Sequence, residues 1–190
     1  PPSQETGFPA SCAARHARTH KNILFLGNSY TYGNNLKSMV AGLASGAGFS
    51  ATVDEKSQGG VTLGWHAANS LAKITAGDWD VVVLQDQSQR PSFGSPYVIG
   101  TILPEAVTLV KTIREKNPCT LPLFFQTWGK RDGDTGNCAN GATALCTYEG
   151  VQDQLTQAYS SFAYYTQPAR VAPAGEAWRN YANRNSLFAG

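Results

Sequence analysis

Apolar and polar positions along this chain predict five strands separated by helices. The third apolar run is rich in β-branched residues, which is typical of a strand covered on both faces. The five predicted strands are NILFLG (22–27), FSATVDE (49–55), DWDVVVLQ (78–85), LPLFFQTW (121–128) and ARVAPAG (169–175). Strands that alternate with helices indicate an α/β fold, with a parallel sheet covered by helices on both faces.

Four segments between these strands have the apolar spacing of helices, at 35–48, 62–75, 97–117 and 147–166. Pro104 interrupts the third segment, so we expect an irregular first part and a regular helix after the proline. Residues 129–146 are instead polar and glycine-rich, and loops of this length in compact domains are commonly functional. This loop follows the fourth strand, which predicts a place at the carboxyl edge of the sheet.

Length and composition fit one globular domain. The chain has 190 residues, and we expect an N-terminal tail at 1–21 followed by one domain at 22–190. Hydrophobic residues make up 42% of the chain, charged residues 15%, and the net charge is +2 without a basic run. These values argue against a disordered chain and against a nucleic-acid partner. No apolar run approaches the length of a membrane span, and the first residues lack a signal-peptide pattern, so an exported protein would already have lost its signal.

The four cysteines permit three disulfide pairings. Cys138 and Cys146 flank a loop of small residues, so we pair these two, which leaves Cys12 with Cys119 and ties the tail to the body. The alternative is four free thiols in a cytosolic protein. The even count favours an oxidising compartment and therefore a secreted protein. No C-x-x-C pair is present and there are only three histidines, so we expect no metal site.

Small and polar residues follow the predicted strands, and the carboxyl ends of parallel strands meet in one crevice. Ser29 follows the first strand, Gly60 the second and Gln87 the third. A serine esterase needs a nucleophile and hydrogen-bond donors aimed at the developing oxyanion. Ser29 offers both a hydroxyl and an N–H, Gly60 offers an unshielded N–H, and Gln87 offers a side-chain amide. We also expect Asn28, Asp86 and Trp128 to line the substrate site.

Each of these features has an ordinary structural interpretation. A serine after a strand is more often the N-cap of the next helix, and two glycines after a strand commonly form a turn. The argument for a site therefore depends on the three residues arriving in order, each at a strand end.

That order resembles the SGNH hydrolase superfamily, also called GDSL-like esterases and lipases. FLGNSYT is similar to the first block of the superfamily, with Asn28 where many members carry Asp. GGVT is similar to the second block through Gly60, and LQDQS falls where the third has Gly-x-Asn-Asp, with Gln87 in the Asn position. An uncharacterised branch with GNSxT, LQxxS and a later TW is more similar still. The resemblance runs from about Asn22 to the end of the chain.

The resemblance implies a flavodoxin-like three-layer α/β/α sandwich with a five-stranded parallel sheet in the order 2-1-3-4-5. It also implies hydrolysis of small esters, such as acetyl groups on carbohydrates or short acyl chains, without a cofactor. In this superfamily an Asp-x-x-His segment near the C-terminus supplies the general base. No histidine follows His66 in this sequence, so we expect the base and a closing helix beyond Gly190, and poor or no activity from the chain as given.

Other residues could substitute for the base. His66 is the candidate near the sheet edge, although a partly buried helix residue is the simpler interpretation. His16 and His20 would require the tail to fold back. Asp132 and Asp134 lie in the long loop, where solvated turn residues are the ordinary interpretation.

Two further functions compete with an esterase. One is a non-catalytic, carbohydrate-binding extracellular module, with aromatic residues stacking on sugars; its candidates are Trp128, Tyr148 and Trp178. The other is a structural subunit completed by a neighbouring subunit or a second copy of the chain. An Asp-x-x-His segment encoded after Gly190 would favour the esterase.

Overall fold

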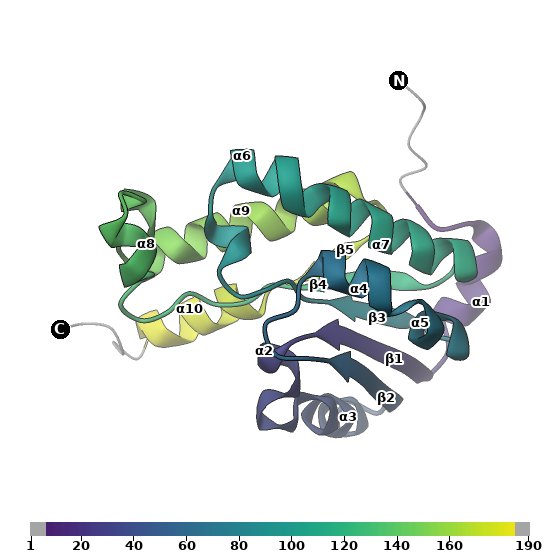
Figure 1. Ribbon diagram of the computed structural model, residues 1–190. Helices are drawn as coiled ribbons and strands as arrows, with labels where there is room; N and C mark the ends of the chain where they lie inside the picture. Colours follow the sequence, from purple (N-terminus) through teal and green to yellow (C-terminus); the bar gives the residue numbers. More distant parts are fainter. Residues whose placement is uncertain (1–6, 185–190) are drawn as a thin grey trace.

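The computed structural model describes residues 7–184 and contains one five-stranded parallel sheet in the order β2-β1-β3-β4-β5 (Figure 1). The strands are β1 (His20–Gly27), β2 (Ser50–Ser57), β3 (Val81–Leu84), β4 (Leu121–Phe125) and β5 (Arg170–Ala172). Each overlaps one of the five apolar runs, so the predicted strands and their order are confirmed.

Helices cover both faces of the sheet. Figure 1 shows α4, α5, α7 and α9 over one face and α3 under the other. The helices are α1 (Ala13–His16), α2 (Ser29–Tyr32), α3 (Leu36–Gly46), α4 (Leu63–Asn69), α5 (Leu71–Ala76), α6 (Ser95–Tyr97), α7 (Leu103–Lys116), α8 (Thr135–Ala139), α9 (Tyr148–Tyr165) and α10 (Ala174–Arg184). Short 3-10 turns lie at Ala10–Cys12, Gly33–Asn35, Arg90–Ser92 and Thr143–Leu145, and a π-helical turn at Val98–Ile102. No helix in the described part of the chain is long and apolar enough to cross a membrane.

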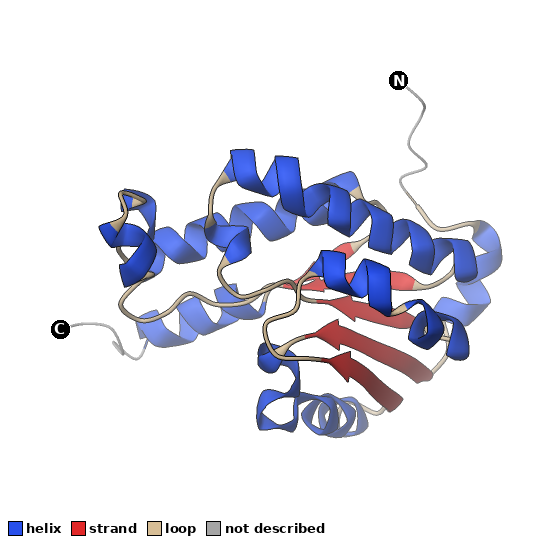
Figure 2. Cartoon of the chain, in the orientation of Figure 1, coloured by secondary structure: helices blue, strands red, loops and turns tan. Residues whose placement is uncertain are grey.

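The pairing of the strands aligns their carboxyl ends at one edge. Gly27 of β1 lies opposite Ser57 of β2, and Leu26 lies opposite Leu84 of β3. Figure 2 shows the loops that leave these strands gathering at the arrowhead edge. Three loops, beginning at residues 28, 58 and 85, are therefore brought together by the sheet itself.

Two of the helical features differ from the sequence prediction, and one confirms it. The segment 62–75 breaks at Ser70 into α4 and α5. The segment before Pro104 is π-helical and the chain after it is a regular helix, as the missing proline N–H predicts. Helix α10 after β5 was not predicted. The closing helix expected beyond Gly190 lies outside the described residues.

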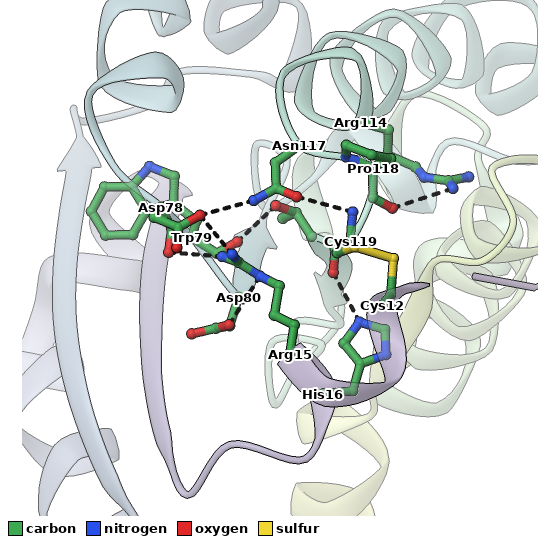
Figure 3. The surroundings of a disulfide bond; sticks show 11 residues. Cys12, Arg15, His16, Asp78, Trp79, Asp80, Arg114, Asn117, Pro118 and Cys119 are labelled. Atoms are coloured by element: carbon green, nitrogen blue, oxygen red, sulfur yellow. Dashed lines mark hydrogen bonds and ion pairs between the residues drawn. A yellow bond between two sulfur atoms is a disulfide. The ribbon is translucent and has the colours of Figure 1, made fainter. Parts of the chain in front are cut away.

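Residues 12–16 are held against the amino end of the sheet, where the strands begin (Figure 3). The disulfide Cys12–Cys119 joins them to the turn that precedes β4. Arg15 bonds Asp78 Oδ1 at 2.6 Å and lies 3.1 Å from Asp80 Oδ1. His16 Nε2 lies 2.9 Å from the Cys119 carbonyl oxygen. Helix α1 and the disulfide thus cover the amino edge of the sheet.

The second disulfide, Cys138–Cys146, closes the glycine-rich loop at 129–146. Asp134 caps helix α8 in this loop by accepting hydrogen bonds from the Asn137 N–H and side chain, and it also accepts from Gln89 Nε2 at 3.0 Å. Both expected disulfides are therefore present, and the long loop is an ordered wall next to the third strand-end loop.

Candidate functional site

Ser29 stands at the turn between β1 and α2. It is the first residue of α2 and is exposed, while Asn28 before it is the N-cap. Asn28 Oδ1 accepts the Tyr30 N–H at 3.2 Å. The N-cap interpretation of Ser29 is therefore wrong, because the neighbouring asparagine has that role. Within residues 7–184 the Ser29 hydroxyl has no hydrogen-bond partner.

The Asn28 side chain ties the three loops together. Its Nδ2 donates to the Val61 carbonyl at 3.0 Å and to the Asp86 carbonyl at 3.1 Å. Val61 is the residue after Gly60, and Asp86 is the residue before Gln87. One buried amide therefore holds the loops that carry the two expected oxyanion donors against the turn that carries Ser29.

Gln85 completes this amide network from the end of β3. Its Oε1 accepts the Asn28 N–H at 3.1 Å and the Thr31 hydroxyl at 2.9 Å, and its Nε2 donates to Asn28 Oδ1 at 3.0 Å. The close packing explains Gly27, since a Cβ there would lie 2.0 Å from Thr31 Oγ1 and 2.9 Å from Gln85 Oε1. Sequence reasoning missed this role of Gln85, although the residue lies inside the LQDQS motif.

Gly60 lies in a tight turn that directly follows β2, within the second loop. Its φ is +72°, which favours glycine, and the Val61 N–H closes the turn on the Gln58 carbonyl at 3.4 Å. Within the described part of the chain, the Gly60 N–H has no acceptor, and no atom lies within 4 Å of where a Cβ would be. This N–H is available to an external acceptor.

Gln87 is oriented by the backbone that follows it. Its Oε1 accepts the N–H groups of Gln89 at 2.8 Å and Arg90 at 3.1 Å. Since the carbonyl end of the amide is used in this way, the NH₂ end is the part left to donate, and it has no partner among residues 7–184.

The sequence predicts that Asp86 and Asn28 line the substrate site, but both are buried. Their exposed fractions are 0% and 2%, so both lie beneath the loops and support them. Asp86 Oδ1 accepts the Leu63 N–H at 2.8 Å and lies 3.1 Å from Arg90 Nη1. Burial raises the pKa of Asp86 to about 6, although Arg90 and the Leu63 N–H act in the opposite direction.

None of the three histidines can serve as a base for Ser29. His66 is fully buried, with Nε2 3.0 Å from the Gly27 carbonyl oxygen and Nδ1 2.9 Å from Ser70 Oγ. The carbonyl can only accept, so Nε2 carries the proton and Nδ1 accepts from the serine hydroxyl. Burial lowers the pKa of His66 to about 4, with the Gly27 hydrogen bond opposing it. His66 therefore supports the turn before Ser29 as a neutral ring.

The other two histidines are at the wrong edge. His20 begins β1 and Ser29 follows the end of that strand, so about 23 Å of extended chain separates the ends. His16 bonds the Cys119 carbonyl at the same amino edge.

The acids of the long loop have local partners. Asp132 is exposed and pairs with Arg131 at 2.8 Å. Asp134 is 5% exposed and buried as a cap, so its interpretation as a solvated turn residue is wrong. Burial acts to raise the pKa of Asp134, but hydrogen bonds from Asn137 lower it on balance. Both carboxylates thus have structural partners, and neither contacts Ser29.

An aromatic wall stands next to Ser29. Tyr30 stacks on Trp128, with ring centroids 5.0 Å apart and an interplanar angle of 15°. Trp128 also borders a groove of about 640 Å³ whose other walls come from α10; its lining residues are Trp128, Ala174, Ala177, Trp178 and Tyr181. Tyr148 was a candidate for stacking on a sugar, but it is only 2% exposed, so that interpretation is wrong. Trp128 and Trp178 both line the groove.

Solved structures similar to this one include SGNH and GDSL-like esterases and lipases. A protein from Parabacteroides merdae ATCC 43184 assigned as a GDSL-like lipase has a TM-score of 0.63 and 14% identity, covering 86% of this chain and 81% of that chain. The SGNH-hydrolase family esterase AlinE4 has a TM-score of 0.58 and 13% identity, covering 81% and 76%. A variant of Axe2, an acetyl-xylooligosaccharide esterase from Geobacillus Stearmophilus, has a TM-score of 0.52 and 17% identity, covering 77% and 73%.

The chain therefore has the fold of the SGNH hydrolases, as its sequence motifs predicted. At these identities the likeness establishes the fold and not the reaction. No family model matches the sequence, and no curated protein is significantly similar to it.

Proposed function

We propose that this protein carries an SGNH-type serine hydrolase site for ester bonds, acting on carbohydrate O-acetyl groups or short acyl esters. The observation that carries the proposal is the Asn28 amide, which bonds the Val61 and Asp86 carbonyls. That pair of bonds fixes the loops of Gly60 and Gln87 next to the turn of Ser29. Structural likeness to esterases supports the same reaction class.

In this proposal Ser29 Oγ attacks the ester carbonyl. The Ser29 N–H, the Gly60 N–H and the Gln87 amide stabilise the negative charge that develops on the carbonyl oxygen. The general base is not one of the three histidines of this sequence, because each of them is committed to other contacts or lies at the amino edge. Without a base, such a site retains only the catalysis that the oxyanion donors and binding supply, about 10³ to 10⁴ over water in serine proteases.

Imidazole in solution can replace a missing histidine, and this gives the test. Hydrolysis of p-nitrophenyl acetate is measured with and without added imidazole for the wild type, Ser29→Ala and Ser45→Ala. Ser45 is an exposed serine of α3 and serves as the matched control. We expect weak activity that imidazole increases in the wild type and in Ser45→Ala. Equal rates for the wild type and Ser29→Ala, at every imidazole concentration, would refute the nucleophile.

None of the three histidines is placed to activate Ser29, and this supports a second candidate, a non-catalytic carbohydrate-binding module. Its binding surface would be the groove between Trp128 and Trp178. Glycan binding that persists in Ser29→Ala, together with the absence of Ser29-dependent hydrolysis, would favour this function. The two disulfides support a secreted location in either case.

A further inference from the structure

The loop that carries Gly60 is held by two carboxylates from other parts of the chain. The Leu63 N–H donates to Asp86 Oδ1 at 2.8 Å, and the Gly64 N–H donates to Glu105 Oε2 at 3.1 Å. Both N–H groups belong to the first turn of α4, where backbone donors lack partners within the helix. Thus Asp86 and Glu105 fix the start of α4, three to four residues after Gly60.

One guanidinium joins the two carboxylates. Arg90 Nη1 lies 3.1 Å from Asp86 Oδ1, and Arg90 Nη2 lies 3.0 Å from each Glu105 oxygen. The Arg90 side chain is only 13% exposed, and its Nε donates to the Tyr97 hydroxyl at 3.2 Å. Gly64 permits the close approach, since a Cβ there would lie 2.7 Å from Glu105 Cδ.

The same arginine also holds the other donor. Its backbone N–H donates to Gln87 Oε1 at 3.1 Å, which fixes the orientation of the Gln87 amide. Arg90 is therefore connected to the Gln87 amide through its backbone and to the Gly60 loop through its side chain. Electrostatic stabilisation of an oxyanion depends on donors that are already in place.

We propose that Arg90 and Glu105 are positioning residues that set the spacing of the Gly60 and Gln87 donors. The inference rests on the proposed function, because it assigns these donors to the oxyanion of that site. If the cluster of Asp86, Arg90 and Glu105 were merely structural, a substitution that weakens it would lower stability and leave the spacing of the two donors unchanged. The two roles differ in their effect on binding of a tetrahedral anion at Ser29.

Phenylboronic acid is a suitable probe, because it requires no turnover. Its boron accepts an electron pair from Ser29 Oγ to form a new B–O bond, the serine hydroxyl proton passes to solvent, and the product is a tetrahedral boronate anion. Oxidation states do not change. Binding is followed by ¹¹B NMR titration, and stability by urea unfolding of the same samples.

The variants are Arg90→Lys and Glu105→Gln, with Arg15→Lys as the matched control. Arg15 has a similarly buried side chain, 11% exposed, and pairs with two aspartates at the opposite edge of the sheet. We expect Arg90→Lys and Glu105→Gln to weaken boronate binding at least tenfold. Arg15→Lys should lower the urea midpoint about as much as Arg90→Lys does, but should leave boronate affinity within twofold of the wild type.

Three results would overturn these assignments, and they are distinguishable. Wild-type affinity in both Arg90→Lys and Glu105→Gln shows that the cluster is merely structural. A tenfold loss in Arg15→Lys shows that boronate binding follows global stability. Equal boronate binding by the wild type and Ser29→Ala overturns the proposed function and the positioning role together.

Discussion

Two buried titratable groups next to the Ser29 turn should give this protein opposing pH responses. His66 is buried as a neutral ring, and its pKa falls from 6.5 to about 4. Between these values the unfolded chain binds a proton that the folded chain does not, so stability falls as the pH falls. The pKa of Asp86 rises from 3.8 to about 6, so there the folded chain binds the proton and stability rises as the pH falls through 6.

The two effects partly cancel between pH 7 and pH 5, and the effect of His66 is the larger. From these pKa values, His66 removes about 2 kcal/mol of unfolding free energy over that range, and Asp86 adds about 1 kcal/mol. The perturbations are His66→Gln, whose amide can still donate to the Gly27 carbonyl, and Asp86→Asn. His66→Gln should become more stable at pH 5 relative to pH 7 by about 2 kcal/mol more than the wild type does.

Asp86→Asn should shift in the opposite direction, by about 1 kcal/mol. The two variants therefore differ by about 3 kcal/mol in their pH response, and other titrating groups contribute equally to both. Urea unfolding at pH 7 and pH 5, followed by tryptophan fluorescence, measures the difference. His20→Gln is the control, since His20 is exposed at the other edge. An unchanged pH response in His66→Gln would refute the assignment of a neutral, buried ring.

The disulfides and the aromatic wall give two further predictions. Replacing Cys12 and Cys119, separated by 107 residues, by serines should lower the unfolding free energy by about 5 kcal/mol on chain-entropy grounds, against about 2.5 kcal/mol for Cys138 and Cys146, separated by 8. Urea unfolding of both double variants checks this, and equal losses would contradict the loop-length argument. Trp128→Ala should raise KM for p-nitrophenyl acetate several-fold with kcat nearly unchanged, in steady-state assays with imidazole; a fall in kcat alone would indicate that the Tyr30 stack orients Ser29 instead.

The sheet was predictable because each of its strands can be identified from the residues of that strand alone. Each strand is a short apolar run, and strands that alternate with helices leave few topologies for the sheet. Pro104 likewise predicts its own irregular helix start, since the proline ring removes one backbone donor. Helix α10 was missed because its apolar residues are few: Trp178 and Tyr181 are aromatic and partly exposed, and the rest of its sequence is mostly polar or small.

The supports of the site were harder to predict, because they depend on long-range contacts. Glu105 reaches Gly64 across 41 residues, and nothing in either segment indicates the other. Asp86 directly follows Gln85 at the end of the third strand. Its sequence position predicted correctly that it lies at the site edge, but not that its side chain is buried beneath the loop. That burial depends on Arg90 and on the start of α4.

Asn28 shows why this chain departs from an aspartate at the same position. Its Nδ2 donates to two backbone carbonyls, and its Oδ1 accepts from Tyr30 and Gln85. An ionised aspartate could accept the hydrogen bonds from Tyr30 and Gln85, but it could not donate to the two carbonyls. Its charge would instead face those two carbonyl oxygens, next to the buried Asp86. The amide is therefore dictated by its partners, and so is the amide of Gln85, which both accepts and donates. Because amides do not titrate, the frame that holds the three loops together keeps its hydrogen bonds across the pH range in which Asp86 and His66 change their charge.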